Sequence, residues 1–248
     1  MNAGFVSIVI PTYNEGARIR SCLEKVVNYL DARFSRFEII VVDDGSTDET
    51  HQQVAESSNK EPRIRCVRFS ANHGKGFAVR QGVLAAGGDV IFFTDADLST
   101  PVEEIQKGLE ELENGCPVVI ASRHHPESII ALSQSRQREA AGKAFNLIVR
   151  TLLSLPFRDT QCGFKGFSRE AAREIFSLAR IDGFAFDAEI LVIARGLRYR
   201  VKEIPVCWTN SAESKVRPVR DLSRVIRDLL KIYRNERDGV YRPQGVKI

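Results

Sequence analysis

The strongest constraint on the fold is an alternation, in the first half of the chain, between short apolar runs and helix-length segments. The runs are VSIVI, EIIVVD, RCVRF, DVIFFTD and VVIAS, at residues 6–10, 38–43, 65–69, 89–95 and 118–122. Such runs are typical of buried parallel strands, and the segments between them begin near Glu15, Asp48, Gly76 and Pro101. The pattern predicts an α/β fold with a mostly parallel sheet and helices on both faces.

Polar and acidic clusters follow three of the predicted strands. They are PTYNEG after the first strand, DDGSTD after the second and DADLS after the fourth. The carboxyl ends of parallel strands open on a common crevice, where ligands of such sheets bind. We therefore expect the three clusters to form one site.

The loop DADLS carries two aspartates, Asp95 and Asp97, on either side of one alanine. This spacing lets two hard oxygen ligands reach one divalent cation that keeps waters and donor phosphates as its other ligands. Thr100 is expected to be the N-cap of the next helix, with Pro101 at its first position and Glu103 completing a capping box. Taken alone, paired aspartates in a loop are more often capping or turn residues.

A dinucleotide site of the Rossmann type is an alternative, because it also uses an acid at the end of the second strand. The chain lacks GxGxxG after its first strand, which argues against that site. The segment NHGKG, residues 72–76, could bring backbone amides near phosphates, or form a plain turn.

The three clusters, in this order and at these strand ends, resemble the family-2 glycosyltransferases of GT-A fold. The resemblance implies that PTYNE and DDGS bind the nucleoside and that the DxD motif binds a metal, Mg²⁺ or Mn²⁺, on the donor diphosphate. The implied nucleotide contacts are Pro11, Tyr13, Glu15, Asp43, Asp44 and Asp95, and the implied metal ligands are Asp95 and Asp97.

Later motifs extend the likeness to polyprenyl-phosphate sugar transferases, and among these to dolichyl-phosphate glucosyltransferases. The motifs are SR at 122–123, DTQCGFKGF from Asp159, FAFDAEIL from Phe184 and the late WTNSAESKV. A lipid phosphate acceptor needs cationic groups to position it, and the candidates are Arg123, Arg136, Arg138 and Lys165. We expect Asp97, Arg123 and Lys165 to be catalytic, and Arg136, Arg138 and Lys165 to bind the acceptor phosphate. Alternatively, Arg136 and Arg138 form a solvated helix face and Lys165 caps a strand. His124 and His125 are interpreted as surface residues of a polar loop.

The basic charge is concentrated at the C-terminal end. From Arg195 onward there are 14 Lys and Arg but 6 Asp and Glu, within a chain of formal net charge +4. We predict a glycosyltransferase domain at residues 1–210 and a basic helical extension at 211–248. Residues 136–153 and 221–234 have the pattern of basic amphipathic helices, which can lie in a membrane interface or simply pack on the domain.

The remaining composition bears on where the protein works. The start of the chain lacks a signal-like apolar core, and no uncharged apolar run approaches the ~20 residues that span a bilayer. The five cysteines are scattered singly without a CxxC pair, which fits a reducing compartment. We expect a cytoplasmic protein, peripherally associated with the cytosolic face of a membrane, that binds no nucleic acid.

The resemblance thus implies an inverting transferase that moves a sugar, glucose from UDP-glucose by preference, to a polyprenyl or dolichyl monophosphate. Alternatives are another sugar such as mannose, or a soluble or glycan acceptor, for which Asp187 or Glu189 would have to act as base. A third reading is a non-catalytic module that binds nucleotide sugars.

Overall fold

The computed structural model describes residues 4–132, 136–210 and 218–242, with the side chains of residues 136–138 and 218–222 left out of the description. Its centre is a seven-stranded sheet in the order β3-β2-β1-β4-β7-β5-β8. The strands of this sheet are β1 (Val6–Thr12), β2 (Phe37–Asp44), β3 (Ile64–Phe69), β4 (Val90–Thr94), β5 (Val118–Ser122), β7 (Phe164–Ser168) and β8 (Val201–Pro205). All five strands expected in the first half of the chain are present.

The sheet is mostly parallel, as predicted, with one exception. β7 runs antiparallel to both of its neighbours, β4 and β5, while the other pairings are parallel. A second, two-stranded sheet pairs β6 (Ile129–Leu132) with β9 (Cys207–Thr209). The strands β6, β7, β8 and β9 were not predicted from the sequence.

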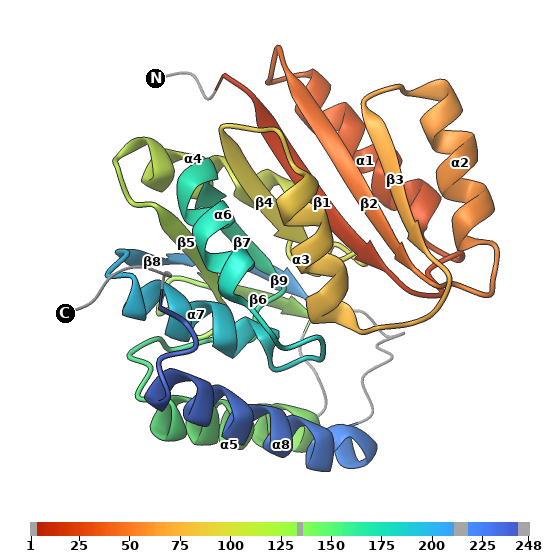
Figure 1. Ribbon diagram of the computed structural model, residues 1–248. Coiled ribbons are helices and arrows are strands. Elements are labelled where there is room, and N and C mark those ends of the chain that lie inside the picture. The colour runs from red at the N-terminus through yellow and green to blue at the C-terminus, as the bar shows by residue number, and fades with distance from the viewer. Residues whose placement is uncertain (1–3, 133–135, 211–217, 243–248) are drawn as a thin grey trace.

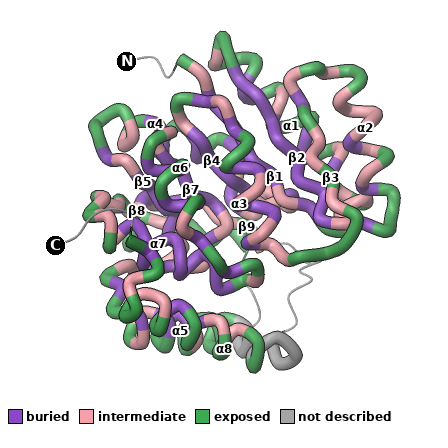
Figure 2. The backbone as a smooth tube through the Cα atoms, viewed as in Figure 1, coloured by how far each residue is buried: buried purple, intermediate pink, exposed green. Residues whose placement is uncertain are grey.

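Helices cover both faces of the sheet, also as predicted (Figure 1). One face packs against α1 (Ile19–Asp31), α2 (Thr50–Lys60) and α4 (Ile105–Glu113), which follows the short 3-10 helix η1 (Val102–Glu104). The other face packs against α3 (Lys75–Ala85), α5 (Arg136–Leu152), α6 (Arg169–Leu178), α7 (Phe186–Gly196) and α8 (Pro218–Arg237). The central strands are buried (Figure 2), which agrees with their unbroken apolar runs.

The start of the fourth predicted helix differs from the expectation. Pro101 has an extended backbone and occupies the cap position, and no side chain caps the helix. The hydroxyl of Thr100 lies 3.5 Å from the Cys162 thiol, so it does not cap Glu103. The prediction of a Thr100 capping box was wrong, because the buried Thr100 side chain has a partner from the second half of the chain.

The C-terminal segment packs on the domain. Leu229, Ile232 and Tyr241 belong to the larger hydrophobic cluster, together with α7 residues such as Ile193. Figure 1 shows α8 beside α5, below α7. The described part of the predicted extension at 211–248 thus contains the helix α8 and shares the core of the domain, while residues 211–217 and 243–248 lie outside the described part of the chain.

Among the described residues, no helix is both long and apolar enough to cross a membrane. All five cysteines are free thiols. Burial raises the pKa of the Cys22 thiol to about 12 and that of Cys66 to about 11, so these thiols stay protonated at neutral pH.

Candidate active site

The three strand-end clusters meet at one edge of the sheet, as the sequence predicted. The backbone amide of Asn14, after β1, donates to the Ser46 hydroxyl after β2 at 2.9 Å. The Thr47 amide returns a hydrogen bond to the Asn14 side chain at 2.8 Å. On the other side, a guanidinium nitrogen of Arg18 lies 4.0 Å from an Asp97 carboxylate oxygen after β4.

Two predicted nucleotide contacts, Asp43 and Asp44, have different environments although they are adjacent. Asp43 is fully buried, and one of its oxygens accepts a 2.9 Å hydrogen bond from the Ser46 amide. Its other oxygen has no hydrogen-bond partner among the described residues and faces Arg68 Nε at 3.4 Å. His51 Nδ1 lies 3.7 Å from the same oxygen, so Arg68 and His51 both face this predicted nucleotide contact.

Asp44 instead stabilises the start of α3. Its carboxylate accepts hydrogen bonds from the backbone amides of His73 at 3.0 Å and Gly74 at 2.7 Å. The amides of the glycine-rich segment at 72–76 that could have held a phosphate therefore point at a side chain of the protein. Gly45, which follows Asp44, has a φ of +75°, and a Cβ there would lie 2.5 Å from the Ala71 backbone.

The remaining predicted nucleotide contacts lie at the end of β1. Pro11 is a half-buried β1 residue, and Tyr13 is 42% exposed at the edge of the crevice. The carboxylate of Glu15 lies 2.9 Å from Arg18 Nε. The Glu15 amide donates to the Thr50 hydroxyl at 2.7 Å, which ties this loop to the N-terminal end of α2.

Asp95 and Asp97 lie in a tight turn at the end of β4. The Leu98 amide donates to the Asp95 carbonyl at 3.1 Å, and Leu98 has the left-handed φ of +47°, a strained conformation for such a residue. The Ser99 amide donates to the Asp97 carboxylate at 2.9 Å. Both side chains keep exposed surface, 36% for Asp95 and 22% for Asp97.

Lys75, which the sequence analysis did not single out, contacts this turn. Its ammonium lies 2.7 Å from Asp95 Oδ1. Burial by itself would lower the pKa of Lys75, but the carboxylates of Asp95 and Asp187 outweigh it and hold that pKa above its ordinary value. The signal was present in NHGKG, where a lysine begins a helix beside a strand-end acid.

The turn also explains a glycine of the DTQCGFKGF motif. A Cβ at Gly163 would lie 2.0 Å from Asp95 Oδ2, so any side chain there would displace the carboxylate. The motif from the second half of the chain thus packs directly on the predicted metal ligand.

The two aspartates fit a hard divalent cation that shares its ligands with a substrate. Among the described residues, no group of three or more His, Cys, Asp or Glu side chains could hold a metal by itself. Mg²⁺ is commonly held by one or two carboxylates together with substrate phosphates and waters. Positive groups of the protein, Lys75 and Arg18, approach these carboxylates, which indicates a position that favours positive charge.

Arg123 forms a two-point ion pair with Asp159. Its Nε and Nη2 atoms lie 2.7 and 3.0 Å from the two carboxylate oxygens, and its backbone amide adds a third contact at 3.0 Å. Burial alone would raise the pKa of Asp159, but Arg123 lowers it to about 2. Such bidentate pairs fix the arginine in one orientation, and Arg123 retains 26% of its side-chain surface.

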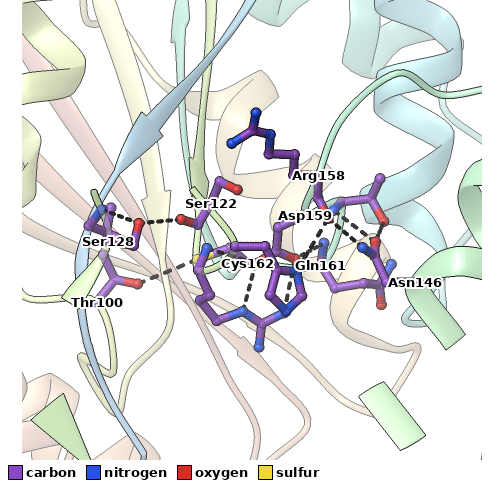
Figure 3. Close-up of polar contacts among 12 residues, drawn as sticks. Thr100, Ser122, Ser128, Asn146, Arg158, Asp159, Gln161 and Cys162 are labelled. Atoms are coloured by element: carbon purple, nitrogen blue, oxygen red, sulfur yellow. Dashed lines mark hydrogen bonds and ion pairs between the residues drawn. The ribbon is translucent and has the colours of Figure 1, made fainter. Parts of the chain in front are cut away.

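Asn146 connects this pair to α5. Its amide oxygen accepts hydrogen bonds from the backbone and hydroxyl of Thr160, and its amide nitrogen donates to the Arg158 carbonyl. In Figure 3, Asn146, Arg158 and Asp159 gather on one side of this network and Ser122 lies on the other. The DTQCGFKGF motif is therefore held between α5 and the end of β5.

Lys165 lies in the interior of the protein. It is fully buried on β7, forms an ion pair with Asp187 of α7, and donates to the Cys162 carbonyl at 2.8 Å. Burial raises the pKa of Asp187 more than Lys165 and Lys75 lower it. In this arrangement the ammonium of Lys165 has no surface to offer an acceptor phosphate.

The other residues considered from sequence are placed as follows. Arg136 and Arg138 lie in the first turn of α5, and their side chains are outside the described part of the structure. Glu189 is fully buried, accepting hydrogen bonds from the Ile181 amide and the Tyr241 hydroxyl, so its contacts are structural. Asp187 is occupied by Lys165, and neither acid is placed as a surface base.

The chain is similar to known glycosyltransferases. The family described as "Glycosyl transferase family 2" matches residues 7–176. Dolichyl-phosphate beta-glucosyltransferase of Homo sapiens is 35% identical over 96% of this chain and 77% of its own length. The enzyme of the same name from Dictyostelium discoideum is 36% identical over 92% of this chain and 73% of its own length.

Among solved structures, the chain shares its fold with glucosyl-3-phosphoglycerate synthase from Mycobacterium tuberculosis. The complex of that protein with Mn²⁺, UDP-glucose and phosphoglyceric acid superposes with a TM-score of 0.66 at 21% sequence identity. The match covers 97% of this chain and 81% of that chain. The likeness confirms the predicted GT-A fold.

Proposed function

Because the chain belongs to glycosyl transferase family 2, we propose that this glycosyltransferase moves glucose from UDP-glucose to the phosphate of a dolichyl or other polyprenyl lipid. The observation that carries the proposal is the similarity to dolichyl-phosphate beta-glucosyltransferases, at 35% and 36% identity over more than nine-tenths of the chain. The motifs in the second half of the chain, which pack on the strand-end site, fall within that similarity.

The donor is proposed to bind along the ends of β1, β2 and β4. Asp43, which is paired with Arg68, is proposed to contact the nucleoside together with Pro11, Tyr13 and Glu15. Asp44 supports this surface indirectly, because its carboxylate is already shared by two backbone amides. Asp95 and Asp97 lie where the diphosphate would follow.

A divalent cation, Mg²⁺ or Mn²⁺, would be held by Asp97 with Asp95. When bound, it would act as a Lewis acid that stabilises the negative charge of the departing nucleoside diphosphate. Lys75 would leave its contact with Asp95 Oδ1 and remain close enough to share the charge of the diphosphate. Gly163 keeps Asp95 in place by leaving room for its carboxylate.

The acceptor phosphate is itself the nucleophile in this proposal. The second pKa of a phosphate monoester is ~6, so it is largely dianionic at neutral pH and requires no general base. Direct displacement inverts the anomeric centre. Arg123, held rigidly by Asp159, and Arg136 and Arg138 at the start of α5 are proposed to position the phosphate.

Lys165 is proposed to act from beneath the site, not as a phosphate ligand. Its ion pair with Asp187 places a positive charge below the turn that carries Asp95, and Asp187 also interacts with Lys75. The positive charges of Lys75 and Lys165 thus offset part of the negative charge of Asp95, Asp97 and Asp187. The site must also bind a metal cation and a diphosphate.

We propose that the protein contacts the cytosolic face of the membrane through α5 and α8. Both helices expose large apolar side chains between cations: Leu147 and Ile148 on α5, and Ile226, Leu230 and Tyr233 on α8. Basic amphipathic helices of this kind bind membrane interfaces. The inner residues of α8, Leu229 and Ile232, pack on the core.

A panel of labelled nucleotide sugars offered with polyprenyl phosphate tests the proposal. We expect label from UDP-glucose to become extractable into organic solvent, in a reaction that requires Mg²⁺ or Mn²⁺. Extraction of label from GDP-mannose instead would select the mannose alternative. Transfer only to a water-soluble acceptor would support the alternative of a soluble or glycan acceptor. Donor binding without transfer would support the alternative of a non-catalytic module that binds nucleotide sugars.

A further inference from the structure

A basic groove lies on α5, and none of the residues assigned above to donor or acceptor lines it. It has a volume of about 390 Å³ and is lined by His124, Lys143, Asn146, Leu147, Arg150 and Arg158. No acidic side chain lines it, in a protein with nearly as many acidic as basic residues. Lys143, Leu147 and Arg150 share one helix face, at spacings of four and three residues.

Two of the three Lys and Arg side chains that line the groove are available to a ligand. Within the described part of the chain, Arg150 and Arg158 form no ion pair, whereas Lys143 pairs with Glu139 at 2.6 Å. The Nε atom of Arg150 is buried and has no hydrogen-bond partner among the described residues. Because a buried cationic N–H group without an acceptor is costly, the Arg150 guanidinium, which lines the groove, is suited to bind an anion.

An apolar groove continues from the basic one. It has a volume of about 370 Å³ and is lined by Leu147, Ile148, Thr151 and Leu152. Leu147 lines both grooves, so cationic and apolar surfaces meet at one side chain. A free phosphate ion would use the cations alone, whereas a lipid with a phosphate headgroup and an acyl chain would use both.

We propose that this groove binds the phosphate headgroup of an anionic membrane phospholipid. The proposal rests on the proposed function for the membrane location, and it adds a site separate from that of the reacting lipid. Arg136 is seven residues from Lys143 and fourteen from Arg150, or about 10 and 20 Å along a helix that rises 1.5 Å per residue. The bound headgroup would fix how α5 lies on the bilayer.

The groove also adjoins the active site through the backbone. The His124 ring and the Asn146 amide both contact the Arg158 carbonyl, at the residue before Asp159. His124 and Arg158 thus neighbour the Arg123–Asp159 pair in sequence while their side chains line the groove. A headgroup held there would orient the proposed acceptor end of the site toward the membrane surface.

The test measures sedimentation of the full chain with vesicles of phosphatidylcholine, and with vesicles that also contain phosphatidylserine. The variant Arg150→Gln/Arg158→Gln removes two charges from the groove. Each Lys or Arg near an anionic surface contributes about fivefold in binding, so we expect roughly thirtyfold weaker binding to the serine-containing vesicles. Binding to phosphatidylcholine alone should be unchanged.

A matched control removes two exposed charges from the opposite face of the sheet. Lys25→Gln/Lys60→Gln, on α1 and α2, should change vesicle binding by less than about twofold. Equal losses in the two double variants would show that net charge, not the groove, governs binding, and would overturn the proposal. Undiminished binding of Arg150→Gln/Arg158→Gln would overturn it as well.

Transfer assays in detergent solution separate this proposal from the proposed function. The groove variant should retain the wild-type KM for a detergent-dispersed polyprenyl phosphate. A raised KM there would mean that the groove holds the reacting lipid, against the proposal. Absence of transfer by the wild-type protein would contradict the proposed function, while the vesicle experiment would still test the groove. Competition by soluble inorganic phosphate that equals the effect of the variant would identify a free-anion site instead.

Discussion

The donor end of the site and the end proposed for the acceptor differ in how their charges are used. At the donor end, Asp95 and Asp97 keep exposed surface and meet cations that can move aside, Lys75 and Arg18. At the other end, Arg123 is locked to Asp159, and Lys165 is buried with Asp187. The first arrangement leaves carboxylates available to a ligand, whereas the second uses most of its charge to hold the protein together.

The difference teaches that charge alone does not identify a ligand residue. Arg123 and Lys165 were grouped as catalytic residues on the strength of their motifs, yet only Arg123 retains exposed surface. Removing a donor-end carboxylate should therefore affect transfer and leave the fold intact. Removing a buried partner should affect the fold first.

The largest effect is expected at Asp97. Asp97→Asn removes one hard anionic ligand with little change in size, and we expect transfer to fall by roughly a thousandfold because metal stabilisation of the leaving group is lost. Thermal unfolding should be nearly unchanged. Asp89→Asn is the control, since Asp89 is an exposed acid paired with Arg169 at the surface. Activity like that of the wild type with added Mg²⁺ or Mn²⁺ would remove the metal from the mechanism.

The second-largest effect is expected at Lys165, where the acceptor end of the site should differ from the donor end by affecting stability first. Lys165→Met removes the ion-pair partner of the buried Asp187 and leaves it the weaker interaction with Lys75, which should lower the free energy of unfolding by about 3 to 5 kcal/mol. Lys165→Met/Asp187→Asn should recover much of that loss, because neither buried charge remains. Chemical denaturation of both variants measures the difference.

Acceptor kinetics of the double variant decide between the two roles of Lys165. We expect its KM for lipid phosphate to stay close to that of the wild type, because the buried ammonium does not reach the phosphate. A KM for lipid phosphate raised tenfold or more, with the KM for the donor unchanged, would restore Lys165 as the phosphate ligand that the sequence predicted.

Acid should weaken the Arg123–Asp159 pair. The folded pKa of Asp159 is about 2, below its ordinary value of 3.8, so the pair stabilises the fold at pH values above about 4. That contribution, about 2 kcal/mol, is lost as the pH falls from about 4 towards 2. Urea unfolding of Asp159→Asn should show a smaller loss of stability over this range than the wild type. Parallel pH profiles would assign the acid sensitivity to other groups.

The two ends of the site were not equally predictable from sequence. Asp95 and Asp97 were found because their chemistry is local, since a strand end, a tight turn and two acids lie within a few residues. The environment of Lys165 could not be predicted in this way, because its partner Asp187 is 22 residues away along the chain. Asp187 lies on a helix that the hydrophobic pattern of the sequence did not predict. Likewise β7 was missed, since the short run FKGFS becomes a strand only between β4 and β5.

The smallest effect is expected on the outer face of α8. Arg224, Arg227 and Lys231 are exposed there, and the neighbouring Ile226 and Leu230 are 46% and 42% exposed. We expect each of these exposed cations to act through the field of the membrane and not through a fitted contact. Arg224→Gln should weaken binding to vesicles that contain phosphatidylserine by about fivefold at most, with the loss disappearing at high salt as the Debye length shrinks.

Leu230→Ser should instead weaken binding to charged and neutral vesicles alike, because it removes apolar area from the membrane-facing side of α8. A loss for Arg224→Gln that matched the groove double variant, or that persisted at high salt, would place a specific headgroup contact on α8 and would end the distinction between the two helices.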